Sequence, residues 1–217
     1  MGDREAKAAL FEQFARVGKA LAGGKRLELL DLLAQGERTV EALARTAGLG
    51  LTTASAHLQT LRQAGLVATR REGTKIHYRL AGADVAALFA LVRQVANTHL
   101  PDVEAARVAY LGPACDEVTR EELLERVKSG AVTVLDVRPA EEYAAGHIPG
   151  AVGIPLDELP DRLAELPADQ EVIAYCRGAY CVLAHDAVRY LTDQGRPARR
   201  LADGLLEWRL AELPLAV

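Results

Sequence analysis

The spacing of the apolar residues changes near the middle of the chain, and this change limits the fold more than any other feature. Before Leu111-Gly112-Pro113, the pattern predicts helices and a single β-hairpin. After this break, apolar runs typical of buried strands, 132–136 and 171–175, alternate with helical segments. A chain of 217 residues is long enough for two domains. We therefore predict a mainly α domain over residues 1–110 and an α/β domain with a mostly parallel sheet over residues 117–217.

The N-terminal half is predicted to contain four helices and then a hairpin. Apolar residues at helical spacing indicate an amphipathic helix over the first twenty residues and three more helices before Gly65. Two strand-like segments, 66–71 and 75–80, follow, and a last helix runs from about Asp84 to Thr98. Two helices joined by a short turn and followed by a hairpin are a DNA-binding arrangement, because the second helix fits the major groove. The sequence therefore predicts a winged helix-turn-helix.

Positive charge is concentrated on the predicted reading helix and wing. Residues 1–110 hold 15 Lys+Arg against 11 Asp+Glu, a net charge of +4, whereas residues 111–217 hold 11 against 19, a net charge of −8. Basic residues attract the phosphates of DNA. The residues expected to contact DNA face outward from the fourth helix or lie on the wing: Thr52, Thr53, Ala56, Gln59, Arg62, Arg70, Arg71 and Lys75. A winged helix that contacts protein instead of DNA is the alternative.

The segments from Ser55 to Val67 and from Arg70 to Leu80 resemble the ArsR family of bacterial repressors, and the resemblance covers residues 6 to about 98. The resemblance implies a homodimer that is joined by its first and last helices and binds palindromic operator DNA. Some members of the family sense metal through cysteines on the helix before the reading helix. Residues 39–48 contain neither cysteine nor histidine, so we predict no metal site and no cofactor.

The chemistry of the C-terminal half is expected at a cysteine that follows a predicted strand. Cys176 lies between the strand 171–175 and an amphipathic helix. Backbone N–H groups at a helix N-terminus favour an anion, so the pKa of this thiol should fall and Cys176 should act as a thiolate nucleophile. Arg177 is expected to add positive charge, and Gly178 to permit a tight turn. A cysteine that is simply buried in the core is the alternative.

Three further motifs accompany this loop: Asp136 to Tyr143, Gly146 to Ala151 and Asp203 to Trp208. Together with the loop they resemble a rhodanese domain over about 117–212. The resemblance implies that Cys176 carries a persulfide. It also assigns the residues of the active-site loop, which are Cys176, Arg177, Gly178, Ala179, Tyr180 and Cys181, and the residues that brace the fold, which are Asp136, Arg138 and His147.

The loop departs from the commonest rhodanese form in two places. Its glycine comes one residue earlier, and Cys181 stands where Arg or Thr is usual, so an anion-binding side chain is missing and thiosulfate turnover is in doubt. Cys181 is a candidate resolving thiol that attacks a persulfide on Cys176 and leaves a disulfide. A small buried residue is the alternative at this position. Cys115, in the linker, is expected to be incidental unless it pairs with a loop cysteine.

Three functions are compatible with these features. In the first, the chain is a DNA-binding transcription regulator whose affinity for double-stranded operator DNA depends on sulfane sulfur or oxidation at Cys176 and Cys181. In the second, it is an active sulfurtransferase that takes sulfur from a small sulfur-containing anion or a persulfide, under the control of the DNA-binding domain. In the third, the rhodanese fold is an inactive binding module, which the intact Cys176 argues against.

The same sequence predicts a cytoplasmic protein that is not associated with a membrane. No apolar run approaches the roughly 18 residues that a bilayer crossing needs. The first five residues carry charges where a signal peptide needs an apolar core, and the three cysteines have no disulfide-framework spacing. A reducing cytoplasm is therefore the expected compartment.

Overall fold

The structure is a computed structural model, and it describes residues 3–113 and 115–217. Contacts between Cα atoms divide the chain into two compact units, Met1–Leu91 and Val92–Val217, and the division falls inside one helix, α5 (Ala83–His99). The domain bounds inferred from the sequence stay a prediction, because packing does not establish where an independently folding domain ends.

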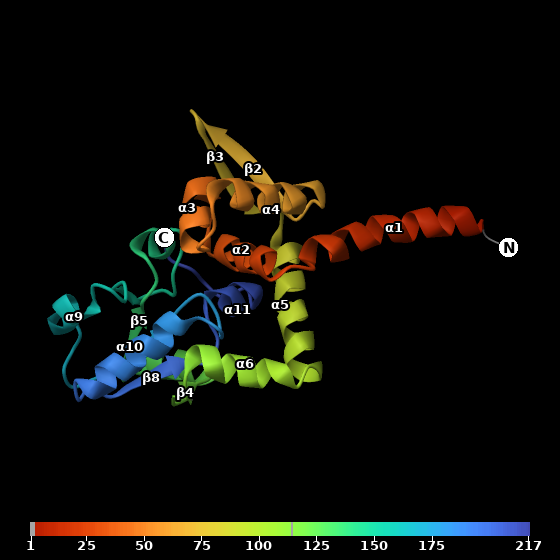
Figure 1. Ribbon diagram of the computed structural model, residues 1–217. Helices are drawn as coiled ribbons and strands as arrows, with labels where there is room; N and C mark the ends of the chain where they lie inside the picture. Colours follow the sequence, from red (N-terminus) through yellow and green to blue (C-terminus); the bar gives the residue numbers. More distant parts are fainter. Residues whose placement is uncertain (1–2, 114) are drawn as a thin grey trace. The chain divides into compact units, whose positions relative to one another are not determined.

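The N-terminal unit contains helices and a small antiparallel sheet, as the sequence predicted. Before α5 its elements are α1 (Arg4–Leu21), α2 (Gly24–Gln35), β1 (Arg38–Thr39), α3 (Val40–Thr46), α4 (Leu51–Gln63), β2 (Val67–Glu72) and β3 (Lys75–Leu80). The strand order is β1-β3-β2, and β1 is a short strand that the sequence pattern did not indicate. Figure 1 shows the β2–β3 hairpin projecting as a wing beyond α3 and α4. The winged helix-turn-helix is thus confirmed.

Local signals in the sequence set the ends of the helices in this unit. The hydroxyl of Thr39 accepts a hydrogen bond from the backbone N–H of Ala42 and so caps α3. Gly48 and Gly65 follow α3 and α4 with φ of +61° and +75°, a conformation that glycine adopts without steric cost. Gly48 therefore ends α3, and Gly65 ends the reading helix α4.

The C-terminal unit is an α/β fold with a parallel sheet. After α5 its elements are α6 (Asp102–Leu111), β4 (Glu117–Val118), α7 (Arg120–Lys128), β5 (Val132–Asp136), α8 (Ala140–Ala144), β6 (Val152–Gly153), α9 (Leu159–Arg162), the 3-10 turn Leu163–Glu165, β7 (Glu171–Tyr175), α10 (Val182–Asp193), β8 (Ala198–Leu201) and α11 (Leu205–Leu210). The strands run parallel in the order β4-β8-β7-β5-β6, which confirms the predicted sheet.

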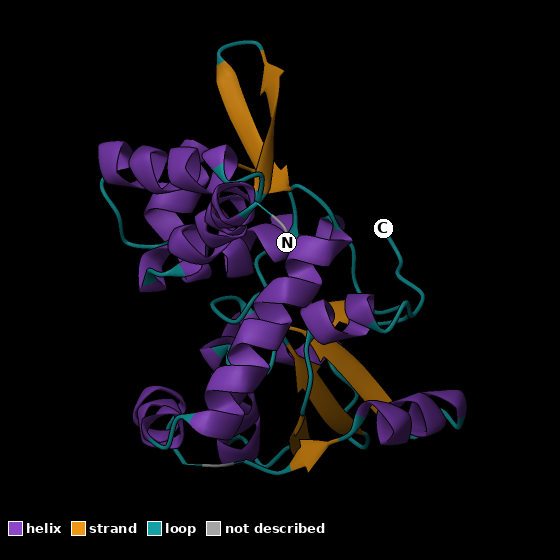
Figure 2. Ribbon diagram, turned by 90° about the vertical axis from the view of Figure 1, so that its right-hand side faces the viewer, coloured by secondary structure: helices purple, strands orange, loops and turns teal. Residues whose placement is uncertain are grey.

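Helices cover both faces of this sheet, as Figure 2 shows. Along β7 and into the next loop, Val172, Ala174 and Cys176 join a core with α9 and α10, whereas Ile173 and Tyr175 join a second core with α7 and α11. Successive side chains of a strand point to opposite faces, so a strand buried on both sides reads as a continuous apolar run. The position of Cys176 follows from this alternation: its side chain lies on the α10 face.

In the described part of the chain, no helix is both long enough and apolar enough to span a lipid bilayer.

Candidate functional site

The loop between β7 and α10 brings Cys176 and Cys181 together. Cys176 follows the last residue of β7 and is 1% exposed. Cys181 is the N-cap residue of α10 and is 9% exposed, and its side chain makes no capping hydrogen bond. The two sulfur atoms form a disulfide across a Cα–Cα distance of 6.2 Å. The predicted nucleophile and the candidate resolving thiol are therefore close enough to exchange a bond.

The backbone of the loop is held from behind by the start of α11. The N–H groups of Leu205 and Leu206 donate to the carbonyl oxygens of Cys176 and Arg177, at 3.0 and 3.1 Å. A side chain on Gly204 would overlap the backbone of Gly178, so only glycine fits between the two segments. Gly178 does not adopt a left-handed backbone conformation in the structure. A tight turn does begin at this residue, because the N–H of Cys181 donates to the carbonyl oxygen of Gly178 at 3.1 Å.

Arg177 faces a buried carboxylate. Its guanidinium donates three hydrogen bonds of 2.6–3.0 Å to Glu142, whose side chain is fully buried at the start of α8. A bidentate Arg–carboxylate pair fixes geometry and neutralises charge. The positive charge that the sequence analysis expected at the loop is thus balanced by Glu142.

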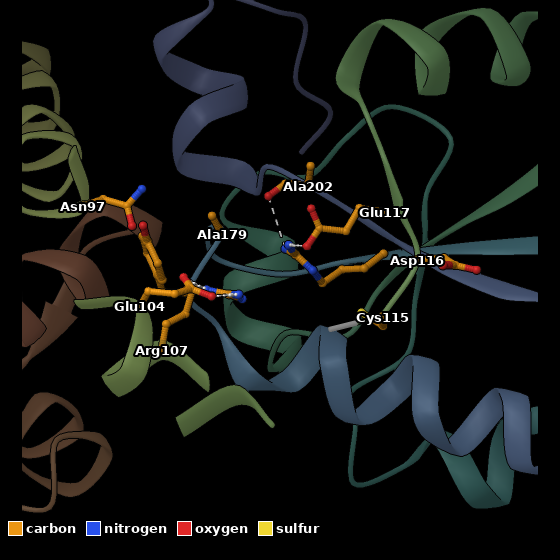
Figure 3. Close-up of a pocket in the computed structure, with 10 residues that line it drawn as sticks. Asn97, Glu104, Arg107, Cys115, Asp116, Glu117, Ala179 and Ala202 are labelled. Carbon is orange, nitrogen blue, oxygen red and sulfur yellow. Dashed lines mark hydrogen bonds and ion pairs between the residues drawn. The ribbon is translucent and has the colours of Figure 1, made fainter. Parts of the chain in front are cut away.

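Ala179 and Tyr180 line a pocket of about 500 Å³ (Figure 3). The other walls come from the end of α5, from α6, from the linker before β4 and from β8; they include Asn97, Glu104, Arg107, Cys115, Asp116, Glu117, Arg200 and Ala202. The guanidinium of Arg93 lies 4.8 Å from the centroid of the Tyr180 ring and forms an ion pair with Glu207 at 3.0 Å. The two cysteines of the active-site loop are therefore buried in the core, whereas Ala179 and Tyr180 line an open pocket.

The residues expected to brace the fold each pair with a nearby side chain. Asp136 and Arg138 are both fully buried, and Arg138 donates to both carboxylate oxygens of Asp136 and to the carbonyl of Gly146. His147 stacks on Tyr143 with 3.8 Å between ring centroids. These contacts support the expected bracing role.

The predicted DNA-contacting residues lie on the exposed sides of α4 and the wing. All of them are exposed except Gln59, which is half-buried: Thr52, Thr53, Ala56, Arg62, Arg70, Arg71 and Lys75. Ala54, Leu58 and Leu61 point into the core, which leaves the opposite side of α4 available to a groove. Helix and wing therefore present polar and basic side chains to solvent.

Two of these residues have partners within the protein. The amide nitrogen of Gln59 donates to the hydroxyl of the buried Tyr78 at 2.9 Å, which fixes how this side chain leaves α4. Arg70 donates to Glu37 and Glu72 at 2.6–2.8 Å, and these carboxylates raise the pKa of Arg70 further above its usual value. DNA phosphates would have to compete with both carboxylates for Arg70. Among the residues that the structure describes, Arg62, Arg71 and Lys75 have no carboxylate partner within ion-pair distance.

Sequence reasoning missed several residues around the loop. Glu142, Arg93 and His185 contact loop residues or Cys115 although they are far from them in sequence. The one signal available was the spacing of His185, four residues after Cys181 on a predicted helix, because residues at this spacing share a helix face. Within residues 3–113 and 115–217, no group of three or more His, Cys, Asp or Glu side chains is arranged to hold a metal ion.

The two halves of the chain match two different families. The model of the bacterial regulatory protein arsR family matches residues 23–69, and the model of the rhodanese-like domain matches residues 119–211. The HTH-type transcriptional regulator Rv0324 of Mycobacterium tuberculosis is 62% identical over 214 residues, which cover 99% of this chain and 95% of that protein. A sulfurtransferase of Allochromatium vinosum is 32% identical over 102 residues, which cover 46% of this chain and 94% of that protein.

A solved structure matches the N-terminal half. It is a fragment of Mb0332 from Mycobacterium bovis, described as a homodimeric winged helix-turn-helix DNA-binding domain. Its sequence is 64% identical, the alignment covers 46% of this chain and 93% of the fragment, and the TM-score is 0.43.

Proposed function

Since this chain belongs to the ArsR family of bacterial transcription regulators and carries a rhodanese-like domain in its C-terminal half, we propose that its binding to operator DNA is controlled by sulfane sulfur at Cys176. The observation that carries the proposal is the pairing of Cys176 with Cys181 at the start of α10. Two adjacent thiols can exist as a dithiol, a persulfide or a disulfide. The loop therefore has distinct chemical states that a regulator can report.

The proposed chemistry needs only a persulfide donor. The Cys176 thiolate attacks the outer sulfur of a donor RS–SH, which leaves as the thiol RSH, and Cys176 becomes a persulfide. Cys181 then attacks the sulfur of Cys176, the disulfide forms, and hydrogen sulfide leaves with the proton of the Cys181 thiol. Because Glu142 neutralises Arg177, a persulfide suits this loop better than the doubly charged thiosulfate.

Exposed apolar side chains support a homodimer. Leu10, Phe11 and Phe14 on α1 are 52–60% exposed, and Leu91 and Val95 on α5 are 49–53% exposed. Only Ala20 of α1 is buried, and Figure 1 shows this helix extending away from the other helices of its unit. Large apolar side chains that are exposed in this way mark an interface. We infer that α1 and α5 join two protomers, so that two copies of α4 contact successive major grooves of the operator.

The proposal is tested by operator binding with and without a persulfide donor. DNA from upstream of the protein's own gene is titrated with reduced full-length protein, before and after treatment with glutathione persulfide. The affinity of the wild type is expected to change by at least about tenfold, a coupling of about 1.4 kcal/mol, whereas Cys176→Ser should bind equally well in both conditions. Equal responses of the two proteins, or no response of either, would overturn the proposal.

Contacts of the wing with phosphate give a second expected result. Replacing Arg71 and Lys75 by alanine should weaken binding to all DNA sequences similarly and reduce the slope of log K against log salt by about 1 for each lost phosphate contact. Lys128→Ala, which removes an exposed charge from α7, is the matched control and should leave both quantities unchanged. An unchanged salt slope in the double variant would place the wing away from DNA.

A sulfurtransferase is the second candidate function, favoured by the position of Cys176 at the end of β7 beside a helix N-terminus. This activity is expected to produce thiocyanate from cyanide and a sulfane-sulfur donor, and Cys176→Ser should abolish it. If the wild type forms thiocyanate and its affinity for DNA does not change with the donor, the chain is a sulfurtransferase rather than a sulfur sensor.

A further inference from the structure

A third cysteine lies on the pocket that the active-site loop also lines. Cys115 is half-buried and packs against the core cluster that contains Cys176 and Cys181. It shares the walls of the 500 Å³ pocket with Ala179 and Tyr180 (Figure 3). The linker thus places a free thiol against the core to which the two loop cysteines belong.

A buried histidine connects Cys115 to the loop. The sulfur of Cys115 lies 3.6 Å from Nδ1 of His185, and His185 is 1% exposed. Its Nε2 is buried without a hydrogen-bond partner among the described residues. His185 is on the first turns of α10, four residues after Cys181, and side chains at this spacing are neighbours with about 5–6 Å between Cβ atoms. Cys115 therefore contacts the side chain next to Cys181.

We propose that Cys115 is a third redox thiol, which attacks Cys181 of the Cys176–Cys181 disulfide and releases Cys176. The inference rests on the proposed function in one respect, namely that Cys176 and Cys181 form a redox pair. The sulfur of Cys115 forms a bond with the sulfur of Cys181, the Cys176–Cys181 bond breaks, and its electron pair stays on Cys176. The Cys115 thiol is hydrogen-bonded to His185, and its proton ends on the released Cys176 thiolate. No oxidant or reductant is consumed.

The surroundings of His185 keep its ring neutral, so that it can accept a hydrogen bond from the Cys115 thiol. Burial, together with the nearby cation Arg200, lowers the pKa of His185 to about 4, while Glu117 opposes this shift. The imidazole is therefore neutral near pH 7 and has a lone pair for the thiol hydrogen of Cys115.

Cys115 is more accessible to solvent than the two loop cysteines, so the exchange can link solvent to the buried disulfide. The loop disulfide is buried, with Cys176 at 1% and Cys181 at 9% exposure, whereas Cys115 lines an open pocket. A small thiol or persulfide from solvent can meet Cys115 without entering the core. Cys115 would then transmit the redox state of the pocket to Cys176.

Tryptic mapping can follow the exchange, because the three cysteines fall on separate peptides, 108–120, 163–177 and 178–189. Full-length protein in the Cys176–Cys181 disulfide form is incubated without added oxidant, quenched with acid, alkylated with iodoacetamide and digested. We expect alkylated Cys176 to accumulate together with a Cys115–Cys181 linked peptide. Alkylation confined to Cys115 would overturn the proposal.

Two variants extend this test. The first removes the loop disulfide, and the second examines the role of the histidine. In Cys176→Ser, diamide should link Cys115 to Cys181 in most molecules, and two alkylated thiols after this treatment would refute the proposal even if no loop disulfide ever forms. His185→Asn removes the imidazole ring that orients the Cys115 thiol, and it should slow the exchange by about tenfold. The matched control His99→Asn, at the exposed end of α5, should exchange at the wild-type rate.

The results also separate this inference from the proposed function. The loop disulfide could form and the persulfide donor could change operator binding while Cys115 never links to Cys181. That result would overturn the proposed exchange and leave the proposed sensing function intact. If Cys115 links to Cys181 but the donor does not change operator binding, the proposed exchange is supported and the proposed sensing function is overturned.

Discussion

Arg138→Leu is expected to lower the free energy of unfolding of the C-terminal unit by about 3–5 kcal/mol. Arg138 and Asp136 are both fully buried, and the guanidinium donates to both carboxylate oxygens. The same guanidinium also donates to the carbonyl oxygen of Gly146, at 2.9 Å. Removing Arg138 therefore leaves a carboxylate and a carbonyl oxygen in the core without their main donor. Urea unfolding, followed by circular dichroism, measures the loss.

A surface pair provides the control for this substitution. Arg162 makes bonds of similar geometry to Glu158 and Glu165, but all three side chains are 34–50% exposed. Water solvates the carboxylates after Arg162→Leu, so the loss should be about 0–1 kcal/mol. The double variant Asp136→Asn/Arg138→Leu should recover part of the stability, since no buried charge remains. Equal losses for Arg138→Leu and Arg162→Leu would mean that burial of the first pair does not matter.

Phe11→Ala/Phe14→Ala is expected to raise the dissociation constant of the homodimer by at least about a thousandfold. The two rings pack edge to face, with centroids 5.7 Å apart, and are 57% and 60% exposed in a single protomer. Burying a phenylalanine side chain contributes roughly 1.5–3 kcal/mol, and a dimer through α1 would bury four of them. Each 1.4 kcal/mol corresponds to about a tenfold change in the dissociation constant.

Sedimentation velocity over a range of concentrations measures this effect. Affinity for a palindromic operator should fall with it, because two reading helices no longer bind together. Ile76→Ala removes a comparably exposed apolar side chain, 44% exposed, from the wing and should leave the oligomeric state unchanged. A double variant that stays dimeric would exclude α1 from the interface.

The elements that the sequence predicts best are those with strong local signals. Thr39 and Thr119 cap α3 and α7 through their hydroxyls, and the continuous apolar runs of β5 and β7 mark strands buried on both faces. By contrast, α6 was not predicted, because it begins after Pro101 without a side-chain cap and buries only Leu111. Such a helix has little amphipathic pattern to detect.

The partners of the site residues are harder to predict than the residues themselves. Cys176 and Cys181 stand out because of the strand before them and the helix after them. The contacts of Arg177 with Glu142, and of Cys115 with His185, join residues separated by 35 and 70 positions. Only the fold sets these distances, so a sequence can suggest a charge or a thiol without indicating what neutralises or activates it.

The start of α10 gives the loop a further property. Helices usually begin with Ser, Thr, Asp or Asn, whose side-chain oxygen accepts a backbone N–H, and lacking this cap costs about 1 kcal/mol. Cys181 occupies the position without such a bond, and its sulfur is tied to Cys176 instead. When the disulfide opens, the first turn of α10 loses its cross-link to Cys176 and should fray. Sulfur chemistry at this loop would then be read as a change in local order, from a fixed helix end to a mobile one.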